Sequence, residues 1–571
     1  MCGLLVSNFN NTSFKKALSQ QSFRGPDGNK ILKFENILLG FNYLSITGKK
    51  KNYWQPYKLK NLVLLFNGEI YNYKELNKKI QKINKNFRSD SDTKTLINYF
   101  LCFGVDKTLK DIRGMWSLCL LDTKNNLLYL SRDRLGIKPL FYYKDKNNFI
   151  FSSSIKSINF LLQKKTIDKA YLKNYLIKGK LDDSKKTPFK SIFNFPKASL
   201  LKINLQNKRN INFNFKKFWQ LNNKETYSIN KTSNFKKLID KNLALHSDIQ
   251  KRVKAAIPLS SGLDSSYIQK KNITENYISI SLAGNFFNEE VPVIKKFVKD
   301  KDLNHLFLNI NKKDYSLQKF KKFIALLDQP IRSFNPYFQF LIRKKAKKLN
   351  VKVLQNGDGG DEVFGGYMYA LPYMLNFFNK KSNSKLKSLK FAFLKDFAKQ
   401  LSKVLSNNNL NKKIDLKEFL INRILKTHIP YWLRVDDEIS MLNSIENRVP
   451  YLDHTILEYC MSIKTQFFYK GGFNKFFFRE AIKKELPKYI LEQRKIGKPG
   501  SSNIVTYTVL KKEILKIIDA NFLKSYIRFS KSKLKKLFLE DVKEKNKLKS
   551  DFWFRVFFLY NWLKKNEKSY S

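Results

Sequence analysis

The sequence predicts two domains, an α+β domain of stacked sheets followed by an α/β domain around a parallel sheet. Three observations predict this fold class. The chain has 571 residues, more than a single hydrophobic core can hold. Its first third alternates short apolar segments with polar turns, as the strands of stacked sheets do. From about Asn234 onward, longer helical segments alternate with buried strand-like segments, which is typical of a parallel sheet.

The composition indicates a globular protein. Hydrophobic residues make up 43% of the chain and aromatic residues 15%. No apolar segment reaches the ~18 residues that a membrane-spanning helix needs. The first residues also lack the basic and long apolar segments of a signal peptide. We therefore expect a cytoplasmic protein with no membrane span.

The cysteines and histidines have no disulfide or metal-binding pattern. The cysteines are Cys2, Cys102, Cys119 and Cys460, and the histidines are His246, His305, His428 and His454. No cysteine pair has the Cys-x-x-Cys spacing, and the histidines lack the short spacing of zinc ligands. The sequence predicts neither a disulfide framework nor a zinc site.

The formal net charge of +63 raises the question of a nucleic-acid partner, because a positive field attracts polyanions. The excess is mostly lysine, is spread along the whole chain and accompanies many Asn, Ile, Phe and Tyr residues. An AT-rich coding sequence would impose this joint bias on surface positions. We interpret the lysines as solvated helix faces and expect no specific nucleic-acid partner. The lysine-rich segment 380–413 has the periodicity of helices joined by a polar loop and indicates no chemistry.

The first domain is predicted to combine strands and helices. Strands are expected at 37–44, 62–66, 116–122 and 127–131, which are apolar or alternating and bounded by turns. Helices are expected at 73–82 and 93–103.

Cys2 is the first candidate catalytic residue. Removal of Met1 would make it the N-terminal residue. Its α-amine would titrate near ~8 and its thiol near ~8.5, so the amine can take the thiol proton and later return it. One residue can thus act as both nucleophile and base.

The sequence Asn-Gly-Glu-Ile-Tyr at 67–71 lies between the second predicted strand and the first predicted helix. An Asn-Gly step at a strand end can aim a side-chain amide and a backbone N–H at one point, where they stabilise an oxyanion. Asn67 and Gly68 are therefore candidates for an oxyanion hole. An ordinary turn is the alternative interpretation of the same pair.

Two loops of the second domain indicate phosphate binding. A short strand at 255–259 precedes Ser-Ser-Gly-Leu-Asp-Ser-Ser at 260–266 and then a helix, so N–H groups face an anion. The spacing differs from the Walker loop, and a serine-rich turn is the alternative. Glycines in Asn-Gly-Asp-Gly-Gly-Asp at 356–361 would let the backbone approach phosphate. Asp264 and Asp361 supply hard oxygen ligands suited to Mg²⁺ between phosphates.

Together these motifs resemble one family. In the first domain they are Met-Cys-Gly at 1–3, Arg-Gly-Pro-Asp at 24–27, Leu-Ser-Ile at 44–46, Asn-Gly-Glu-Ile-Tyr at 67–71, Ser-Asp-Thr at 91–93, Arg-Gly-Met at 113–115 and Arg-Asp-Arg-Leu-Gly-Ile-Lys-Pro-Leu at 132–140. In the second they are the two loops, Ser-Met at 440–441, Glu-Asn-Arg-Val-Pro-Tyr-Leu-Asp at 446–453 and Arg-Lys-Ile-Gly at 494–497. The set resembles glutamine-hydrolysing asparagine synthetase. It implies an α+β N-terminal-nucleophile sandwich domain, the class II glutamine amidotransferase, at 2–217 and an α/β parallel-sheet ATP-pyrophosphatase domain at 234–571.

By this resemblance, Cys2 attacks the glutamine amide, Asn67 and Gly68 form the oxyanion hole, and carboxylates hold the α-ammonium. The implied glutamine-binding residues are Tyr43, Leu44, Ser45, Asn67, Gly68, Glu69 and Asp92. The implied ATP-binding residues are Leu259, Ser260, Ser261, Gly262, Asp264, Ser265, Ile280, Asn356 and Gly357, with Asp264 and Asp361 on magnesium. Asp358 would assist the acyl-adenylate, and Lys495 would stabilise charge on the phosphates.

Three residues depart from the family pattern. Phe23 precedes Arg24 where the family usually has histidine, and Ser261 stands where it has glycine. Tyr43 replaces an arginine that would pair with the glutamine α-carboxylate, and a phenol cannot supply a cationic clamp.

The expected reaction uses ATP with Mg²⁺ and makes an amide in two half-reactions. Cys2 would release ammonia from glutamine, and the ammonia would travel inside the protein to an adenylated carboxylate, most simply the β-carboxylate of aspartate. A second hypothesis keeps the chemistry but places the amide on a sugar acid of a surface polysaccharide, and a third is a non-catalytic regulatory homologue. The expected partners are small-molecule substrates, and the resemblance is compatible with a homodimer.

Overall fold

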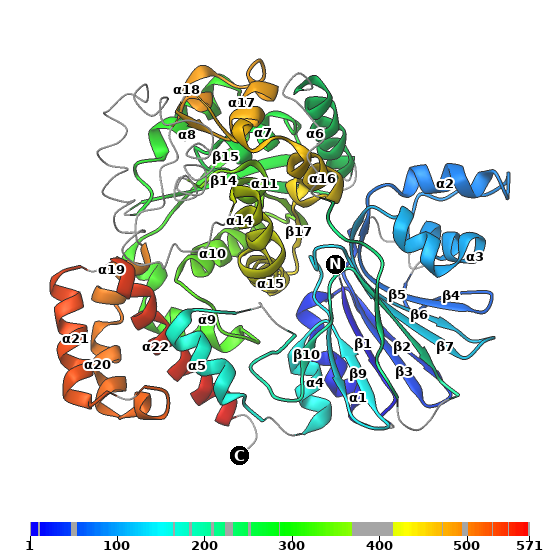
Figure 1. Cartoon of the computed structure of the whole chain (residues 1–571), viewed down its shortest axis with the longest axis horizontal. Coiled ribbons are helices and arrows are strands. Elements are labelled where there is room, and N and C mark those ends of the chain that lie inside the picture. The colour runs from blue at the N-terminus through cyan, green and yellow to red at the C-terminus, as the bar shows by residue number, and fades with distance from the viewer. Residues whose placement is uncertain are drawn as a thin grey trace.

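The protein is described by a computed structural model that covers fourteen stretches of the chain. These are residues 2–9, 12–46, 54–163, 166–181, 185–206, 211–222, 232–248, 253–284, 286–367, 415–470, 472–493, 501–527, 529–545 and 547–568. Lys495 and the predicted helical segment 380–413 lie outside the described residues. Figure 1 shows two halves that meet near the N-terminus. No described helix has the length and apolar character needed to cross a membrane.

The first half contains two six-stranded sheets in which every strand pair is antiparallel. One sheet has the order β10 (Phe193–Asn194), β8 (Phe141–Lys144), β9 (Phe149–Ser152), β1 (Gly3–Ser7), β3 (Ile37–Tyr43) and β2 (Gly28–Phe34). The other has the order β12 (Phe215–Lys217), β11 (Ser199–Asn204), β7 (Leu127–Arg132), β6 (Gly114–Asp122), β5 (Leu62–Ile70) and β4 (Tyr57–Leu59).

Successive side chains of a strand point to opposite faces of its sheet, and both faces of each sheet are packed against other elements. On β1, Leu4 and Val6 enter the core between the sheets, whereas Leu5 packs toward the helices α1 (Phe14–Ser19) and α4 (Ile155–Leu162). On β5, Leu65 faces the same inner core. Its neighbours Leu64 and Phe66 face the other side, toward α2 (Tyr73–Gln81) and α3 (Asp92–Asp111). The two sheets therefore form a sandwich covered by helices, as Figure 1 shows at its right.

The predicted end of one strand was wrong. We expected a strand at 62–66 with Asn67 and Gly68 after its end, but β5 continues to Ile70 and pairs with β6 along its whole length. Strand length depends on the partner strand, which local sequence does not reveal. Gly68 is required there because a Cβ would lie 2.1 Å from the carbonyl oxygen of Met115.

The second half is built on a five-stranded sheet in which all pairs are parallel. Its order is β15 (His305–Asn309), β14 (Tyr277–Ala283), β13 (Ala255–Pro258), β16 (Val353–Gln355) and β17 (Glu446–Arg448). The helices that connect or cover these strands are α6 (Thr232–Ser247), α7 (Leu263–Lys270), α8 (Val291–Asp300), α9 (Leu317–Leu326), α10 (Asn335–Lys348), α11 (Gly360–Phe364), α14 (Leu416–Asn422), α15 (Ile429–Met441) and α16 (His454–Ser462). The predicted fold class is confirmed in both halves.

Later elements complete the second half. The short hairpin β18 (Tyr469–Lys470) and β19 (Phe473–Asn474) is followed by α17 (Phe476–Ile482), α18 (Lys488–Leu491), α19 (Ser501–Thr508), α20 (Lys511–Asp519), α21 (Lys531–Lys543) and α22 (Lys547–Lys568). Helix α22 returns to α5 (Lys169–Lys178) of the first half, where Arg555 Nε donates to the Leu176 carbonyl at 3.0 Å. The C-terminal helix therefore joins the two halves.

Candidate active sites

Cys2 lies at the start of β1, a central strand held between β3 and β9. Its side chain is 6% exposed. The Leu44 N–H donates to Sγ at 3.5 Å, and Arg24 Nε donates to the Cys2 carbonyl oxygen at 3.1 Å. Burial raises the pKa of the thiol, an effect that the nearby N-terminal ammonium and the Leu44 N–H only partly oppose. The resting thiol is therefore protonated and needs a base before it can attack.

Asn67 is placed directly against Cys2. The Cys2 N–H donates to Asn67 Oδ1 at 2.9 Å, and Asn67 Nδ2 donates to Ser117 Oγ at 3.3 Å. These hydrogen bonds hold the carboxamide against the nucleophile. The predicted oxyanion residue and the predicted nucleophile are thus neighbours, although they are 65 positions apart in the sequence.

Two partly buried carboxylates, those of Glu69 and Asp92, lie beside this pair. Burial raises the pKa of Glu69 to about 8, despite the opposing charge of Arg448. Burial also raises the pKa of Asp92, which accepts hydrogen bonds from the N–H groups of Ile70 at 3.2 Å and Thr93 at 2.6 Å. An ammonium group placed between them would favour the ionised form of both carboxylates.

Tyr43 lies near Cys2 and Asp92 and is affected by their charges. Burial, followed by the charges of Cys2 and Asp92, raises the pKa of its phenol to about 12. Its ring packs on Trp54 with centroids 5.3 Å apart. The next residue but one, Ser45, donates its N–H to Asp27 at 2.7 Å. Tyr43 can therefore offer a neutral hydrogen-bond donor but no positive charge.

The second site is a cavity of about 550 Å³ above the parallel sheet. Its lining includes the predicted residues Ser260, Ser261, Gly262, Asp264, Ser265, Asn356, Gly357, Asp358 and Asp361. Leu259 and Ile280 do not line it. Ile280 lies in β14 and Leu259 directly after β13, 0% and 4% exposed, and the Leu259 N–H donates to the Ile280 carbonyl at 3.0 Å.

The serine loop has an unstrained backbone. Ser261 is not among the described non-glycine residues with a positive φ, so a side chain is tolerated at this position. Its N–H donates to Glu290 at 3.3 Å. Ser265, in the first turn of α7, closes the loop by accepting from the Ser260 N–H at 3.1 Å.

Lys475 is a functional candidate that the sequence interpretation missed. Its Nζ lies 2.5 Å from Asp264 Oδ2 and 2.8 Å from Asp361 Oδ1. Burial alone would lower its pKa, but the two carboxylates raise it, so the ammonium stays charged. Lys475 comes from the hairpin before α17 and belongs to no recognised motif. The cavity also contains Arg332 and Arg479, so it is suited to a polyanion.

Asp358 has the character of a proton acceptor. Burial, and then the charge of Asp436, raises the pKa of Asp358 to about 7, while a hydrogen bond from Trp432 opposes the shift. The Asp358 N–H donates to Asn356 Oδ1 at 3.0 Å, and Asn356 Nδ2 donates to Asn447 Oδ1 at 2.9 Å. A carboxylate poised near neutral pH in a cavity wall is suited to general base catalysis.

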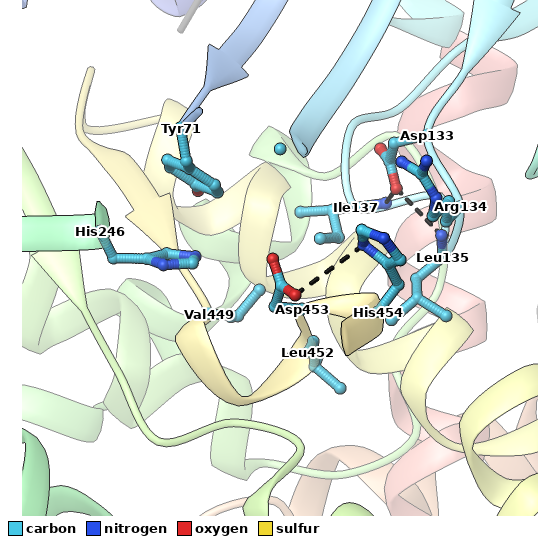
Figure 2. Close-up of a pocket in the computed structure, with 11 residues that line it drawn as sticks. Tyr71, Asp133, Arg134, Leu135, Ile137, His246, Val449, Leu452, Asp453 and His454 are labelled. Carbon is cyan, nitrogen blue, oxygen red and sulfur yellow. Dashed lines mark hydrogen bonds and ion pairs between the residues drawn. The ribbon is translucent and has the colours of Figure 1, made fainter. Parts of the chain in front are cut away.

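A small pocket lies between the two halves and is lined by residues of both (Figure 2). The rings of Tyr71 and His246 pack at a tilt with centroids 3.9 Å apart, and Asp453 and His454 lie opposite them. Burial lowers the pKa of each histidine to about 4, so both are neutral. The opening, about 10 Å³, has room for about one water molecule, so this pocket is part of the junction between the halves rather than a substrate site.

Comparison with known proteins agrees with this architecture. Residues 1–219 match the family described as glutamine amidotransferase domain, and residues 235–564 match the family described as asparagine synthase. A putative glutamine-hydrolyzing asparagine synthetase 2 of Methanocaldococcus jannaschii is 30% identical over 421 residues, 66% of this chain and 78% of the relative. Glutamine-hydrolyzing asparagine synthetase 1 of Bacillus subtilis is 26% identical over 574 residues, 87% of each chain.

Among solved structures, a glutamine phosphoribosylpyrophosphate amidotransferase from B. subtilis aligns with 55% of this chain and 91% of its own, with 11% identity and a TM-score of 0.30. The two family matches place a glutamine amidotransferase domain before an asparagine synthase domain, so the class of protein is a glutamine-hydrolysing ligase. The chain belongs to the asparagine synthase family.

Proposed function

We propose that the protein converts L-aspartate, L-glutamine, ATP and water to L-asparagine, L-glutamate, AMP and diphosphate through a β-aspartyl-AMP intermediate. The strongest support is that one chain contains both sites. Cys2 is buried and hydrogen-bonded to Asn67, and a separate cavity is lined by Lys475 and Asp358. Residues 2–217 and 234–571 would be the two catalytic units. Because the substrates are central metabolites, we place the reaction in the cytoplasm.

In the glutamine half-reaction, Cys2 Sγ attacks the side-chain amide carbon. After Met1 is removed, the Cys2 α-amine takes the thiol proton and returns it to the leaving ammonia. Asn67 and the Gly68 N–H stabilise the negative oxygen of the tetrahedral intermediate. Water then hydrolyses the γ-glutamyl thioester to glutamate and restores the thiol. Glu69 and Asp92 receive the α-ammonium of glutamine.

In the synthetase half-reaction, the substrate carboxylate attacks the α-phosphorus of ATP and displaces diphosphate. Lys475 neutralises charge on the phosphates, and Lys495, which lies outside the described residues, would assist it. Ammonia then attacks the acyl carbon and AMP leaves. Asp358, with its pKa about 7, accepts the proton that the ammonia nitrogen gives up.

Asp264 and Asp361 fit a magnesium ion that is shared with the substrate. Both carboxylates converge on the Nζ atom of Lys475, so their oxygens lie close together in the cavity wall. No group of three metal-ligating side chains occurs among the described residues. Mg²⁺ binds through one or two carboxylates plus phosphate oxygens. When bound, it would neutralise charge on the transferred nucleotide.

The two sites are joined by a buried polar region. Arg24, which contacts Cys2, pairs with Asp437 at 2.8 Å, and Lys138 lies 3.8 Å from the same carboxylate. The preceding residue on α15, Asp436, accepts from Asn356 Nδ2 at 3.1 Å. Passage of ammonia inside the protein keeps it from bulk water, where it would become protonated.

The test is formation of asparagine and diphosphate from ATP, Mg²⁺ and aspartate, with glutamine or ammonium as nitrogen donor. We expect both products with both donors. Products with ammonium alone would place a defect at the glutamine site. Activity only with a sugar acid would mean that this acid, and not aspartate, is the acceptor. No activity with any acceptor would contradict the proposed reaction and indicate a non-catalytic role.

A further inference from the structure

The glutamine site contains a charge supplied by the other domain. Arg448, at the end of β17, places Nη2 3.2 Å from Glu69 Oε2. Its Nε donates to Glu446 at 2.6 Å, and its Nη1 donates to the His246 carbonyl at 2.7 Å. The Arg448 side chain is 1% exposed and lies against the Tyr71 ring, 5.4 Å from its centroid. Hydrogen bonds at Nε and Nη1 therefore hold the guanidinium, and Nη2 is left to form the ion pair with Glu69.

The ion pair between Arg448 and Glu69 orients the Glu69 carboxylate. Glu69, Asp92 and Glu446 are three acids in one buried region, and Arg448 is the cation that bridges two of them. A buried carboxylate without a partner would be protonated or turn away. An α-ammonium that binds between Glu69 and Asp92 needs Glu69 ionised and correctly oriented.

The strand that carries Arg448 also reaches the synthetase site. Its middle residue, Asn447, accepts from Asn356 at 2.9 Å and donates to Asp436. Asn356 in turn accepts from the Asp358 N–H at 3.0 Å. Two consecutive residues of β17 thus contact both sites. Arg448 pairs with Glu69 of the glutamine site, and Asn447 contacts Asn356 in the Asp358 loop of the synthetase site.

We propose that Arg448 is a positioning residue for glutamine, and that β17 couples occupancy of the glutamine site to the Asp358 loop. The inference rests on the proposed glutamine site but not on the identity of the acceptor carboxylate. By linkage, a nucleotide in the cavity then changes glutamine affinity by the same factor by which glutamine changes nucleotide affinity.

The positioning role is tested by glutamine binding to the full chain carrying Cys2→Ala, measured by calorimetry. This readout needs no turnover, so a failure of the proposed reaction remains distinguishable. Arg448→Lys keeps the charge but loses the fork of hydrogen bonds, and we expect glutamine to bind about tenfold more weakly. Glu69→Gln should weaken binding as well, and Arg448→Lys should add little in that background because the partner is gone.

Arg113→Lys is the matched control. Arg113 joins the same two halves through Asp453 at 3.1 Å but does not contact Glu69, so we expect unchanged glutamine affinity. Equal losses in Arg113→Lys and Arg448→Lys would overturn the positioning role, since both would then act through domain docking. Unchanged binding in Arg448→Lys would overturn it as well.

The coupling is tested by repeating the titration with a non-hydrolysable ATP analogue and Mg²⁺. We expect the analogue to change the glutamine Kd in the Cys2→Ala chain. Asn447→Ser leaves Arg448 in place, so it should keep the affinity for glutamine alone but lose the effect of the analogue. A Kd that the analogue does not change, or an effect that survives in Asn447→Ser, would contradict the coupling. If Arg448→Lys does not fold, Glu69→Gln and Asn447→Ser still decide both parts.

Discussion

The two sites neutralise their buried charges in different ways. In the synthetase cavity, Asp264 and Asp361 are paired by Lys475 of the same domain, and the site is roomy, with about 550 Å³. Around Cys2, the carboxylate of Glu69 is paired by Arg448 from the other domain, and the thiol is almost inaccessible. The synthetase site is therefore self-contained, whereas the glutamine site is completed only when the two domains are docked.

Removal of Lys475 should have the largest effect on one site alone. In Lys475→Met, the cavity would lose the ammonium that lies between Asp264 and Asp361 and that we propose neutralises charge on the phosphates. We expect diphosphate release with ammonium to fall by about 10²–10³-fold. Glutamine binding should be unchanged, because Lys475 contacts no residue of the first domain in the described contacts.

The matched control is Lys470→Met, an exposed lysine on β18 of the same hairpin. Its diphosphate release should equal that of the unmodified chain. A similar loss in both variants would mean that the hairpin fold, and not the charge of Lys475, matters.

Loss of one proposed magnesium ligand should have the next largest effect. Asp361→Asn keeps the shape of the side chain but removes its charge. We expect diphosphate release to fall about a hundredfold at limiting Mg²⁺, measured as a titration with the metal. Asp551→Asn changes another carboxylate that lines the cavity and should leave the Mg²⁺ dependence unaltered. An unaltered titration in Asp361→Asn would argue against the metal assignment.

The affinity of the glutamine site for its ligand should depend on pH. Burial raises the pKa of Glu69 to about 8, with Arg448 opposing the shift and Asp92 and Glu446 adding to it. The α-ammonium needs the ionised carboxylate, so glutamine binding must release this proton below pH 8. Affinity in the Cys2→Ala chain should therefore rise about 50-fold from pH 6 to pH 8. In Glu69→Gln this rise should disappear; if it remains, another group carries the proton.

Replacement of Tyr43 should have the smallest effect of the four. Its pKa of about 12 keeps the phenol neutral, so it can donate one hydrogen bond to the α-carboxylate of glutamine. In Tyr43→Arg a cationic fork would replace it, and we expect the KM for glutamine to fall about tenfold. The rate with ammonium should not change. A KM that stays the same would show that another cation already binds the carboxylate.

The same contrast explains what the sequence could and could not predict. The loop residues Ser260 to Ser265 and Asn356 to Asp361 follow strands of the parallel sheet directly, so short motifs were enough to bring them to one cavity. Cys2 was found because its position in the chain carries the chemistry. These predictions depend only on neighbours in the sequence.

Lys475 and Arg448 show why the rest was missed. Lys475 lies 211 positions from Asp264, and nothing in its surrounding sequence distinguishes it from the other lysines of a lysine-rich chain. Arg448 was part of a recognised motif, but its partner Glu69 lies in the other domain. The partner of a buried charge is set by tertiary packing, which a local pattern does not contain.

The central claim is that Cys2 serves the synthetase site only by delivering ammonia. The most direct test compares product formation by Cys2→Ala with glutamine and with ammonium, using ATP, Mg²⁺ and the acceptor that the unmodified chain accepts. We predict that glutamine-dependent product disappears while ammonium-dependent product forms at the unmodified rate. Equal loss with both nitrogen donors would contradict two separate sites joined by ammonia.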